Sequence, residues 1–332
     1  MKREVGRSWI EEVLAKYKLT KVIDTSGAYF PSYGTPTVLL FGRRKAFDGS
    51  PVVVVGGKRG EPGKPANAAL GHVWRSIVQH HATPHFENDF VSVRGVEAET
   101  MRTHPWNVGG GGAVALQSAL EEGGETKLSM HSEAIGRTTV LGEDGAWILS
   151  AGAAARHRLA PDAIPFVVGE HCRDWSLDVT AMELVVYPYE PVGRLPSLSP
   201  AAAIHLWPRR RLLQGRSVFG KQVGEKTGKW WVHLEHYTDK LRTPLSITFA
   251  FKATHNHFVL DRGGKVFKQT APVIKLPAGA TEEEHLALLG QLNSSTACFW
   301  LKQVCHNMGA QGANEGIKQE QWDHFYEHDG TK

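Results

Sequence analysis

Residues 24–44 read DTSGAYFPSYGTPTVLLFGRR, and this stretch determines how the first part of the chain is built. It begins at the end of a short predicted strand, TKVID at 20–24, and passes through a loop that carries aromatic rings and two prolines. It then enters an apolar run, PTVLLFG at 36–42, which predicts a buried strand. Turns between strands usually carry Gly, Pro, Asn, Asp and Ser. The rings of this loop therefore indicate a role beyond reversing the chain.

Regular elements are predicted on both sides of this stretch. Upstream, Ser8 and Glu11 have the spacing of a capping box, and helical spacing of apolar residues predicts an amphipathic helix over 8–17. Downstream, we expect a strand at 51–57, an Asn-capped helix at 67–81 and a strand at 89–95. This alternation is typical of part of an α/β sheet, although the segment is too short for a complete doubly wound domain.

The pattern changes at THPWNVGGGGA, residues 103–113, which is the best candidate for a boundary. A helix is expected at 113–122. From about 127 to 278, short apolar runs alternate with Gly, Pro and charged residues, which predicts a strand-rich region. In one run, SITFAF at 246–251, alternate residues share a face of a strand.

A helical hairpin is predicted near the end of the chain. Thr281 and Glu284 have the spacing of a capping box, and a second helix is expected after Asn293, which would cap it. The domain prediction is an α/β region at 1–106, a hinge and helix at 107–126, and a second domain at 127–332.

Composition places the chain among ordinary globular proteins, since 41% of its 332 residues are hydrophobic and 22% are charged. At roughly 150 residues per domain, this length predicts about two domains. The three cysteines show no C-x-x-C spacing, and no apolar run approaches the roughly 20 residues of a membrane-spanning helix. We therefore expect a cytoplasmic protein with no membrane partner.

The net charge is only +4, but the basic residues are clustered. Clusters occur at 42–45, 56–64, 207–216 and 220–229. Such clusters form either ordinary solvated surface or a face that binds nucleic-acid phosphates, and both interpretations stay open at this point.

No complete catalytic motif is present in the sequence. The GGGG of 109–112 lacks the Lys-Ser/Thr of a P-loop and the G-x-G-x-x-G of a dinucleotide loop, which favours a flexible hinge. In THNHF, His255 and His257 would share one face of a strand as two metal ligands do, but no carboxylate or cysteine lies at a supporting spacing. A hydrogen-bonding strand face is favoured there, and no catalytic residue or metal is assigned.

Four long stretches, in order along the chain, closely resemble the adenine-specific DNA methyltransferases of BREX phage-defence systems, relatives of the TaqI-type and type IIG N6-adenine methyltransferases. They are IDTSGAYFPSYGTPTVLLFGRR, HPWNVGGGGA, RTPLSITFAFKATHNHFVLDRGGKVF and LLGQLNSSTACFWLKQV. The resemblance implies an α/β remnant of an AdoMet-type methyltransferase sheet. An α+β, strand-rich target-recognition domain would follow it.

The family's enzymes carry a Gly-rich AdoMet loop after the first strand and a catalytic N/D-P-P-Y/F tetrapeptide after the fourth. This sequence has neither the loop nor any two adjacent prolines. By order, Met1 falls just downstream of where the tetrapeptide should be, so we expect an internal or truncated piece of a larger enzyme, inactive alone. S-adenosyl-L-methionine is the family's cofactor, and its site is expected outside this chain.

The resemblance also implies roles for individual residues. An enzyme that methylates adenine flips the base out of the stack and holds it on aromatic faces. Phe30 and Pro31 match an F-P of the family's loop between the later strands, which implies that Phe30 stacks on the target base; the alternative is that it only packs beneath the loop. The expected partners are double-stranded DNA, the missing methyltransferase half and other defence-system subunits. The candidates for DNA contacts are Arg43, Arg44, Arg209, Arg210, Arg211, Arg216, Lys221 and Lys229.

Two alternatives of other classes stay open. One is a stand-alone DNA-specificity or adaptor protein without catalysis. The other is an inert gene remnant, and an exposed apolar sheet edge would support this alternative.

Overall fold

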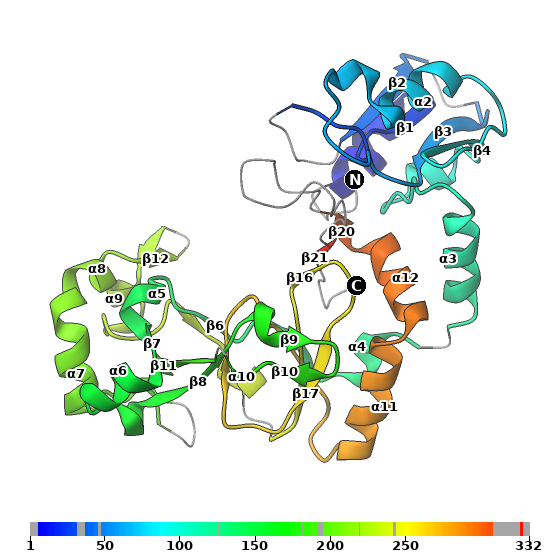
Figure 1. Ribbon diagram of the computed structural model, residues 1–332. Helices are drawn as coiled ribbons and strands as arrows, with labels where there is room; N and C mark the ends of the chain where they lie inside the picture. Colours follow the sequence, from blue (N-terminus) through cyan, green and yellow to red (C-terminus); the bar gives the residue numbers. More distant parts are fainter. Residues whose placement is uncertain are drawn as a thin grey trace. The chain divides into compact units, whose positions relative to one another are not determined.

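The computed structural model describes residues 6–31, 37–45, 48–124, 126–180, 182–190, 195–218, 220–241, 244–307 and 326–327. The chain forms two compact units (Figure 1). The first comprises Met1–Glu125, Cys298–His328 and Lys332, and the second Thr126–Ala297 with Asp329–Thr331. Helices and several small sheets occur in both, so the fold is mixed α/β. In the described ranges, no helix is both long and apolar enough to cross a membrane.

The first unit is built on a four-stranded sheet with the order β2-β1-β3-β4. β1 (Lys18–Asp24) pairs in parallel with β3 (Val52–Gly57) and antiparallel with β2 (Val38–Arg43). β4 (Val91–Val96) pairs antiparallel with β3. All four predicted strands are present, with ends shifted by a few residues. The strand predicted to be buried at 36–42 is instead the edge strand β2, none of whose residues is buried. Only the central pair is parallel.

Both faces of this sheet carry an apolar core, because side chains alternate along β3. Val54 packs with Ile10 in one core. Val55 packs in the other with Val73 and Ile77 of α2 (His72–His80), the helix predicted at 67–81. The unit also contains η3 (Ala68–Leu70), η4 (Thr100–Arg102), α3 (Ala113–Glu122), most of α12 (Ser295–Val304), and the paired strands β20 (His306–Asn307) and β21 (Tyr326–Glu327).

The N-terminal helix differs from its prediction at the start. It runs through α1 (Gly6–Ser8), a π-helical turn η1 (Trp9–Val13) and a 3₁₀ turn η2 (Leu14–Lys16). Ser8 lies inside the helix with φ −58° and makes no side-chain cap. The predicted capping box is therefore wrong, whereas the amphipathic pattern is correct, since Ile10 is fully buried.

The GGGG tract packs against the sheet instead of forming the expected flexible hinge. The Gly110 N–H donates to the Gly57 carbonyl over 3.1 Å, and the guanidinium of Arg94 donates to the Gly109 carbonyl over 3.0 Å. A Cβ atom on Gly110 would lie 2.5 Å from the hydroxyl oxygen of Ser92. These glycines are needed because the backbone approaches β3 and β4 closely.

The second unit contains two four-stranded sheets, with the orders β18-β8-β11-β7 and β17-β15-β19-β5. This confirms the prediction that the region is rich in strands. Every residue of β15 is buried, so both faces of this strand are covered. The strands of these two sheets are β5 (Ala134–Gly136), β7 (Ile148–Leu149), β8 (Ala163–Val167), β11 (Glu183–Val186), β15 (Ser246–Phe249), β17 (Phe258–Asp261), β18 (Val266–Phe267) and β19 (Val273–Lys275).

Short strands and helices complete the second unit. The strands are β6 (Thr139–Val140), β9 (Cys172–Arg173), β10 (Ser176–Leu177), β12 (Ser217–Val218), β13 (Lys221–Gln222), β14 (Glu235–His236) and β16 (Lys252–Ala253). The helices are α4 (Leu128–His131), α5 (Asp144–Trp147), α6 (Ala151–Arg156), η5 (Ala160–Asp162), η6 (Gly169–His171), α7 (Pro200–Leu206), η7 (Trp207–Arg209), α8 (Arg210–Gln214), α9 (Val223–Thr227), α10 (Thr238–Leu241) and α11 (Glu282–Leu292).

The two helices predicted near the end of the chain are present as α11 and α12. Thr281 and Glu284 form the expected capping box at the start of α11, with hydrogen bonds of 2.7 and 3.2 Å. Asn293 does not cap α12; Ser294 does, by accepting from the Ala297 N–H. The side chain of Asn293 instead bonds both backbone groups of Phe258.

Candidate nucleic-acid interface

The aromatic loop after β1 is anchored at its first residues. The hydroxyl of Thr25, which is 1% exposed, contacts the hydroxyl of Thr37 over 2.6 Å and donates to the Thr37 carbonyl over 2.9 Å. Two residues further on, the Gly27 carbonyl accepts from the Glu61 N–H. A Cβ atom on Gly27 would lie 3.1 Å from the Arg59 carbonyl oxygen, so the two segments are in close contact. The residues leading to Phe30 are therefore held against segment 59–61.

The same segment fixes the adjacent helix. Glu61 is 1% exposed, and its carboxylate oxygens accept the N–H groups of His72 and Val73 over 2.7 and 2.9 Å. A carboxylate at this position satisfies two free N–H groups at the start of α2 and interacts favourably with the helix dipole. Loop and helix are therefore coupled through one buried side chain.

Phe30 is half-buried and packs beside α2. Its ring contacts the ring of Trp74 edge to face, with centroids 6.2 Å apart and 67° between planes. It also belongs to the apolar core that contains Ile23 and Val55. Pro31, the next residue, is exposed, and 32–36 lie outside the described residues. Phe30 thus has a packing role, while its half-exposure leaves apolar ring surface available to a base.

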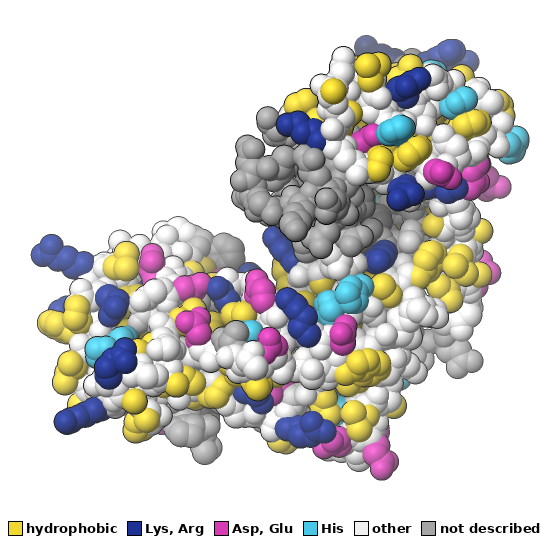
Figure 2. Space-filling view, in the orientation of Figure 1, with side chains coloured by type: hydrophobic (Ala, Val, Ile, Leu, Met, Phe, Trp, Pro, Cys, Tyr) yellow, Lys and Arg dark blue, Asp and Glu magenta, His cyan; other side chains and the backbone are white. Residues whose placement is uncertain are grey.

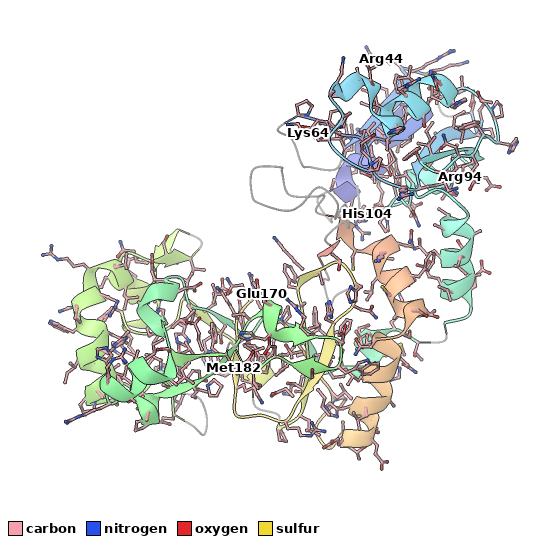
Figure 3. The ribbon with its side chains drawn as sticks, viewed as in Figure 1. Arg44, Lys64, Arg94, His104, Glu170 and Met182 are labelled. Atoms are coloured by element: carbon pink, nitrogen blue, oxygen red, sulfur yellow. The ribbon has the colours of Figure 1, made fainter. Side chains whose placement is uncertain are left out.

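Arg43 and Arg44 lie at the edge of the same unit. Arg43 ends the edge strand β2 and Arg44 follows it, and both are exposed. Arg44 lies at the periphery of the unit in Figure 3. Leu39 and Phe41 of β2 are also exposed, by 39% and 48%. The edge of this sheet therefore combines basic and apolar side chains.

In the second unit, three of the basic candidates follow an exposed tryptophan on the stretch from α7 to α8. Trp207 is 59% exposed. The guanidinium carbon of Arg210 lies 4.8 Å from the centre of the Trp207 ring and 5.8 Å from that of Trp230. Such contacts between guanidinium and aromatic ring contribute about 0.5–1 kcal/mol at exposed sites. Arg210 therefore packs against both rings.

Further exposed side chains extend this surface, which we call the α7–α8 ridge and define as residues 204–212. Ile204 and Leu212 are 75% and 52% exposed, and Arg211 is exposed while Arg209 is half-exposed. Behind the ridge, Leu206 and Leu213 are fully buried in the domain core. This core fixes the backbone from which the arginines extend.

The remaining candidates lie further along the same unit. Lys221 is exposed on β13, and Lys229 is half-exposed immediately after the left-handed Gly228 that ends α9. On the face seen in Figure 2, Lys and Arg side chains are dispersed among acidic and apolar ones. Trp230 and Trp231 pack against the domain core.

Arg216 is a correction to the predicted set of phosphate contacts. Its side chain is 6% exposed, and its guanidinium donates to four backbone carbonyls over 2.6 to 3.1 Å. The acceptors are Leu141, Leu213, Trp230 and Val232. Burial lowers the pKa of Arg216 to about 10, so it remains charged at neutral pH. Arg216 therefore ties the core together and does not reach a phosphate.

A buried group of histidine and tyrosine rings supports the same core. His233 is 2% exposed, and its ring Nε2–H donates to the Val186 carbonyl over 3.0 Å. Tyr189 accepts the backbone N–H of His233 on its hydroxyl over 2.9 Å. Burial, followed by the neighbouring His236, lowers the pKa of His233 to about 3. His233 is therefore neutral at physiological pH and serves the fold.

The arrangement can hold a flat ring and bind phosphates, and the described residues include no assembled acid, base or nucleophile for methyl transfer. Sequence reasoning missed the two aromatic partners, Trp74 and Trp207. For Trp74 the only signal was its place next to the apolar Val73 in a predicted helix. For Trp207 it was an aromatic residue placed before three consecutive arginines.

Comparison with known proteins identifies a relative that matches the whole chain. No protein-family profile matches this chain. Over 343 aligned residues, the chain is 40% identical to the adenine-specific methyltransferase PglX of Streptomyces coelicolor A3(2). The match takes in 100% of this chain but 28% of that protein, so the chain spans little more than a quarter of the relative's length. The resemblance inferred from the four sequence stretches is confirmed.

Similarity to solved structures is weaker. The type IIL restriction-modification enzyme MmeI in complex with DNA gives a TM-score of 0.47 at 7% identity, covering 87% of this chain and 33% of that one. The type IIG restriction endonuclease BpuSI gives a TM-score of 0.41 at 12% identity, covering 96% of this chain and 38% of that one. Scores at this level do not establish a shared fold.

Proposed function

We propose that this chain supplies the target-base loop and the DNA-recognition part of a site-specific N6-adenine DNA methyltransferase of a phage-defence system. The observation that carries this proposal is the 40% identity, over the whole chain, to a protein named as an adenine-specific methyltransferase. The chain corresponds to part of that protein's length, and the methyl-transfer activity is assigned here to the larger assembly.

In this proposal the first unit is the remnant of an AdoMet-type sheet. The parallel pair of β1 and β3, with helices packed on both faces, supports this assignment. The edge strand β2, with Leu39 and Phe41 exposed, offers unpaired backbone groups to which a further strand could add. We place the missing methyltransferase half at this edge.

We further propose that the AdoMet site lies outside the described residues. The loop after β1 carries a single glycine before Phe30, and Gly27 is in close contact with segment 59–61. The side chain of Asp24 accepts the Ser26 N–H and is thereby used within the loop. AdoMet is therefore assigned to sequence outside this chain, and no catalytic step is assigned to the residues present.

The role of the chain is binding and positioning. A flipped adenine loses its stacking in the duplex, and a protein ring that replaces it contributes about 1–3 kcal/mol. Phe30 offers such a ring, and its loop is anchored by Thr25, Gly27 and Glu61. Pro31, which restricts the backbone directly after Phe30, completes the proposed target-base contact.

Phosphate contacts are assigned to cations that reach the surface. In the first unit these are the exposed Arg43 and Arg44. In the second they are the exposed Arg211 and Lys221 and the half-exposed Arg209, Arg210 and Lys229. Each neutralised phosphate releases condensed counterions, which makes the affinity fall steeply with salt. Exposed Trp207, with Arg210 against its ring, adds a surface on which a base or sugar can pack.

Methyl transfer from labelled AdoMet tests the proposal. The purified chain alone should transfer no label to DNA. The same chain mixed with a polypeptide that carries the Gly-rich loop and the N/D-P-P-Y/F tetrapeptide should transfer label to adenine. Label transferred by the chain alone would overturn the division of labour proposed here.

A second candidate is a stand-alone DNA-specificity or adaptor protein. The α7–α8 ridge favours it, because this surface lies wholly within the second unit and does not depend on the sheet of the first. This candidate predicts sequence-selective DNA binding by the chain alone and no gain of methyl transfer on mixing. Methyl transfer that appears on mixing separates the two functions, because only the first function predicts it.

A further inference from the structure

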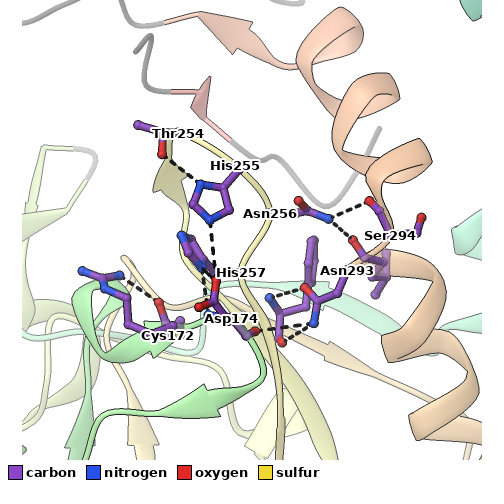
Figure 4. Close-up of polar contacts among 11 residues, drawn as sticks. Cys172, Asp174, Thr254, His255, Asn256, His257, Asn293 and Ser294 are labelled. Atoms are coloured by element: carbon purple, nitrogen blue, oxygen red, sulfur yellow. Dashed lines mark hydrogen bonds and ion pairs between the residues drawn. The ribbon is translucent and has the colours of Figure 1, made fainter. Parts of the chain in front are cut away.

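Three side chains with metal-binding atoms come together in the second unit, although 83 residues separate the first from the last (Figure 4). They are Asp174, His255 and His257. Asp174 lies in the turn between β9 and β10. The two histidines lie in the loop between β16 and β17, not in the strand expected from the sequence. Their ring centroids are 4.0 Å apart.

The distances within this cluster suit ligands of one cation. The Asp174 Oδ1 atom lies 3.4 Å from the Nδ1 atom of His257 and 3.6 Å from the Nε2 atom of His255. Both distances exceed those of good N–H···O hydrogen bonds, which measure about 2.7–3.2 Å. Zinc bonds to imidazole and carboxylate of about 2.0–2.2 Å place tetrahedral ligands roughly 3.3–3.6 Å apart. Both distances from the Asp174 Oδ1 atom match this spacing, and each of the three residues offers a ligand atom within 4.8 Å of the other two.

The orientation of His255 is fixed by a partner on its other nitrogen. Its Nδ1 atom contacts the hydroxyl of Thr254 over 3.1 Å. When Nδ1–H donates to this hydroxyl, Nε2 keeps its lone pair on the side of Asp174. Histidines that bind metals almost always donate their second N–H in this way.

The loop that carries the histidines is anchored to the end of α11. The amide of Asn256 donates to the carbonyls of Leu292 and Ser294 over 2.6 and 3.1 Å. The side chain of Asn293 bonds the N–H and carbonyl of Phe258 over 3.0 and 2.8 Å. Ligands on a loop held from both sides need little reorganisation on binding.

Charge and exposure also suit a cation that keeps contact with solvent. The side chains of Asp174 and His255 are 72% and 49% exposed, whereas that of His257 is 9% exposed. The Asp174 carboxylate offsets part of the cation's charge, while Arg173 beside it opposes binding.

We propose that Asp174, His255 and His257 form a site for one divalent transition-metal ion of the zinc type. The ion takes Oδ1, Nε2 and Nδ1 of the three residues and completes its coordination with water. On binding, Nδ1 of His257 exchanges the Asp174 N–H, which it accepts over 2.9 Å, for the metal. The metal then connects the β9–β10 turn to the 254–258 loop.

Cobalt and zinc titrations of the full chain test this site. The expected result is one bound Co²⁺ per chain, with visible absorption bands that disappear when zinc displaces the cobalt. In competition with a chromophoric chelator, the chain should bind one Zn²⁺. His255→Ala and Asp174→Asn change exposed side chains and should each weaken zinc binding at least about tenfold. His131→Ala, at an exposed histidine of the same unit outside the cluster, should leave the affinity unchanged.

Circular dichroism and the thermal midpoint without metal check that each variant is folded. Zinc should raise the thermal midpoint of the parent chain and of His131→Ala, and should not raise that of the two cluster variants. Equal zinc affinity in all four proteins would overturn the proposal. So would the absence of any cobalt spectrum or zinc uptake in the parent chain at tens of micromolar metal.

Discussion

The ring of Phe30 contacts the ring of Trp74 edge to face, with centroids 6.2 Å apart. An edge-to-face contact covers at most one face of either ring, so this packing is compatible with stacking on a base. The contact therefore joins the two interpretations of Phe30, as core residue and as base platform. Substitutions that keep its bulk and remove its flat face separate them.

Phe30→Leu should cost about 1 kcal/mol or less in the free energy of unfolding, because apolar volume is largely retained. It should weaken binding of a duplex with a bulged adenine by about fivefold or more, because it removes one base–aromatic stack of about 1–3 kcal/mol. Fluorescence anisotropy with bulged and fully paired duplexes measures both affinities. Equal losses for the two duplexes would assign Phe30 a purely structural role.

Arg216→Met should destabilise the fold by about 3 kcal/mol or more, because it leaves several buried carbonyls without a donor. Arg211→Met, on the exposed side of α8, should change the free energy of unfolding by about 0.5 kcal/mol or less. Urea unfolding of the two variants gives the comparison. Similar stability of both would show that Arg216 is not the buried donor described here.

His233 should make the protein less stable as the pH falls. Its pKa is about 3 in the folded protein, below the unfolded value of about 6.5, so the unfolded state binds the proton first. The contribution of the neutral His233 to the free energy of unfolding is fully present above pH 6.5. Below that pH it falls by about 1.4 kcal/mol per pH unit. Urea unfolding from pH 7.5 to 5 should show a shallower pH dependence in His233→Leu than in the parent. Parallel curves would contradict a neutral, buried His233.

Neutralising the ridge should reduce DNA affinity in a salt-dependent way. Arg209→Gln combined with Arg211→Gln removes two proposed phosphate contacts. The slope of log affinity against log salt should therefore fall by about 1 for each of the two arginines replaced. Arg156→Gln, an exposed arginine on α6 outside the proposed set, serves as the matched control. If the control and the double variant reduce the slope equally, the ridge is not the contact surface.

Local patterns predicted much of the first unit. The valine run of β3 and the spacing of Val73 and Ile77 identify buried strand and helix faces, because such periodicity follows from backbone geometry alone. The box of Thr281 and Glu284 was predictable for the same reason, since its two hydrogen bonds span three residues. By contrast, Ser8 has the same spacing but lies within a helix that begins earlier.

Interactions between distant segments could not be predicted. Arg216 belongs to a run that is basic throughout, and only the fold shows that carbonyls of distant segments surround it. The carboxylate near His255 and His257 comes from Asp174, far outside any spacing rule for metal ligands. The prediction of a flexible hinge at GGGG was wrong for a similar reason, because the close approach of Gly110 to Ser92 depends on a neighbouring strand.

Titration of labelled duplex DNA with the full chain, across a range of salt concentrations, is the decisive test of its proposed role in DNA recognition. We expect saturable binding at low salt, with log affinity falling linearly as log salt rises, by about 0.9 per phosphate contact. The same chain should bind a bulged-adenine duplex more tightly than a paired one. Absence of binding to either duplex at the lowest salt, by a folded chain, would contradict that role.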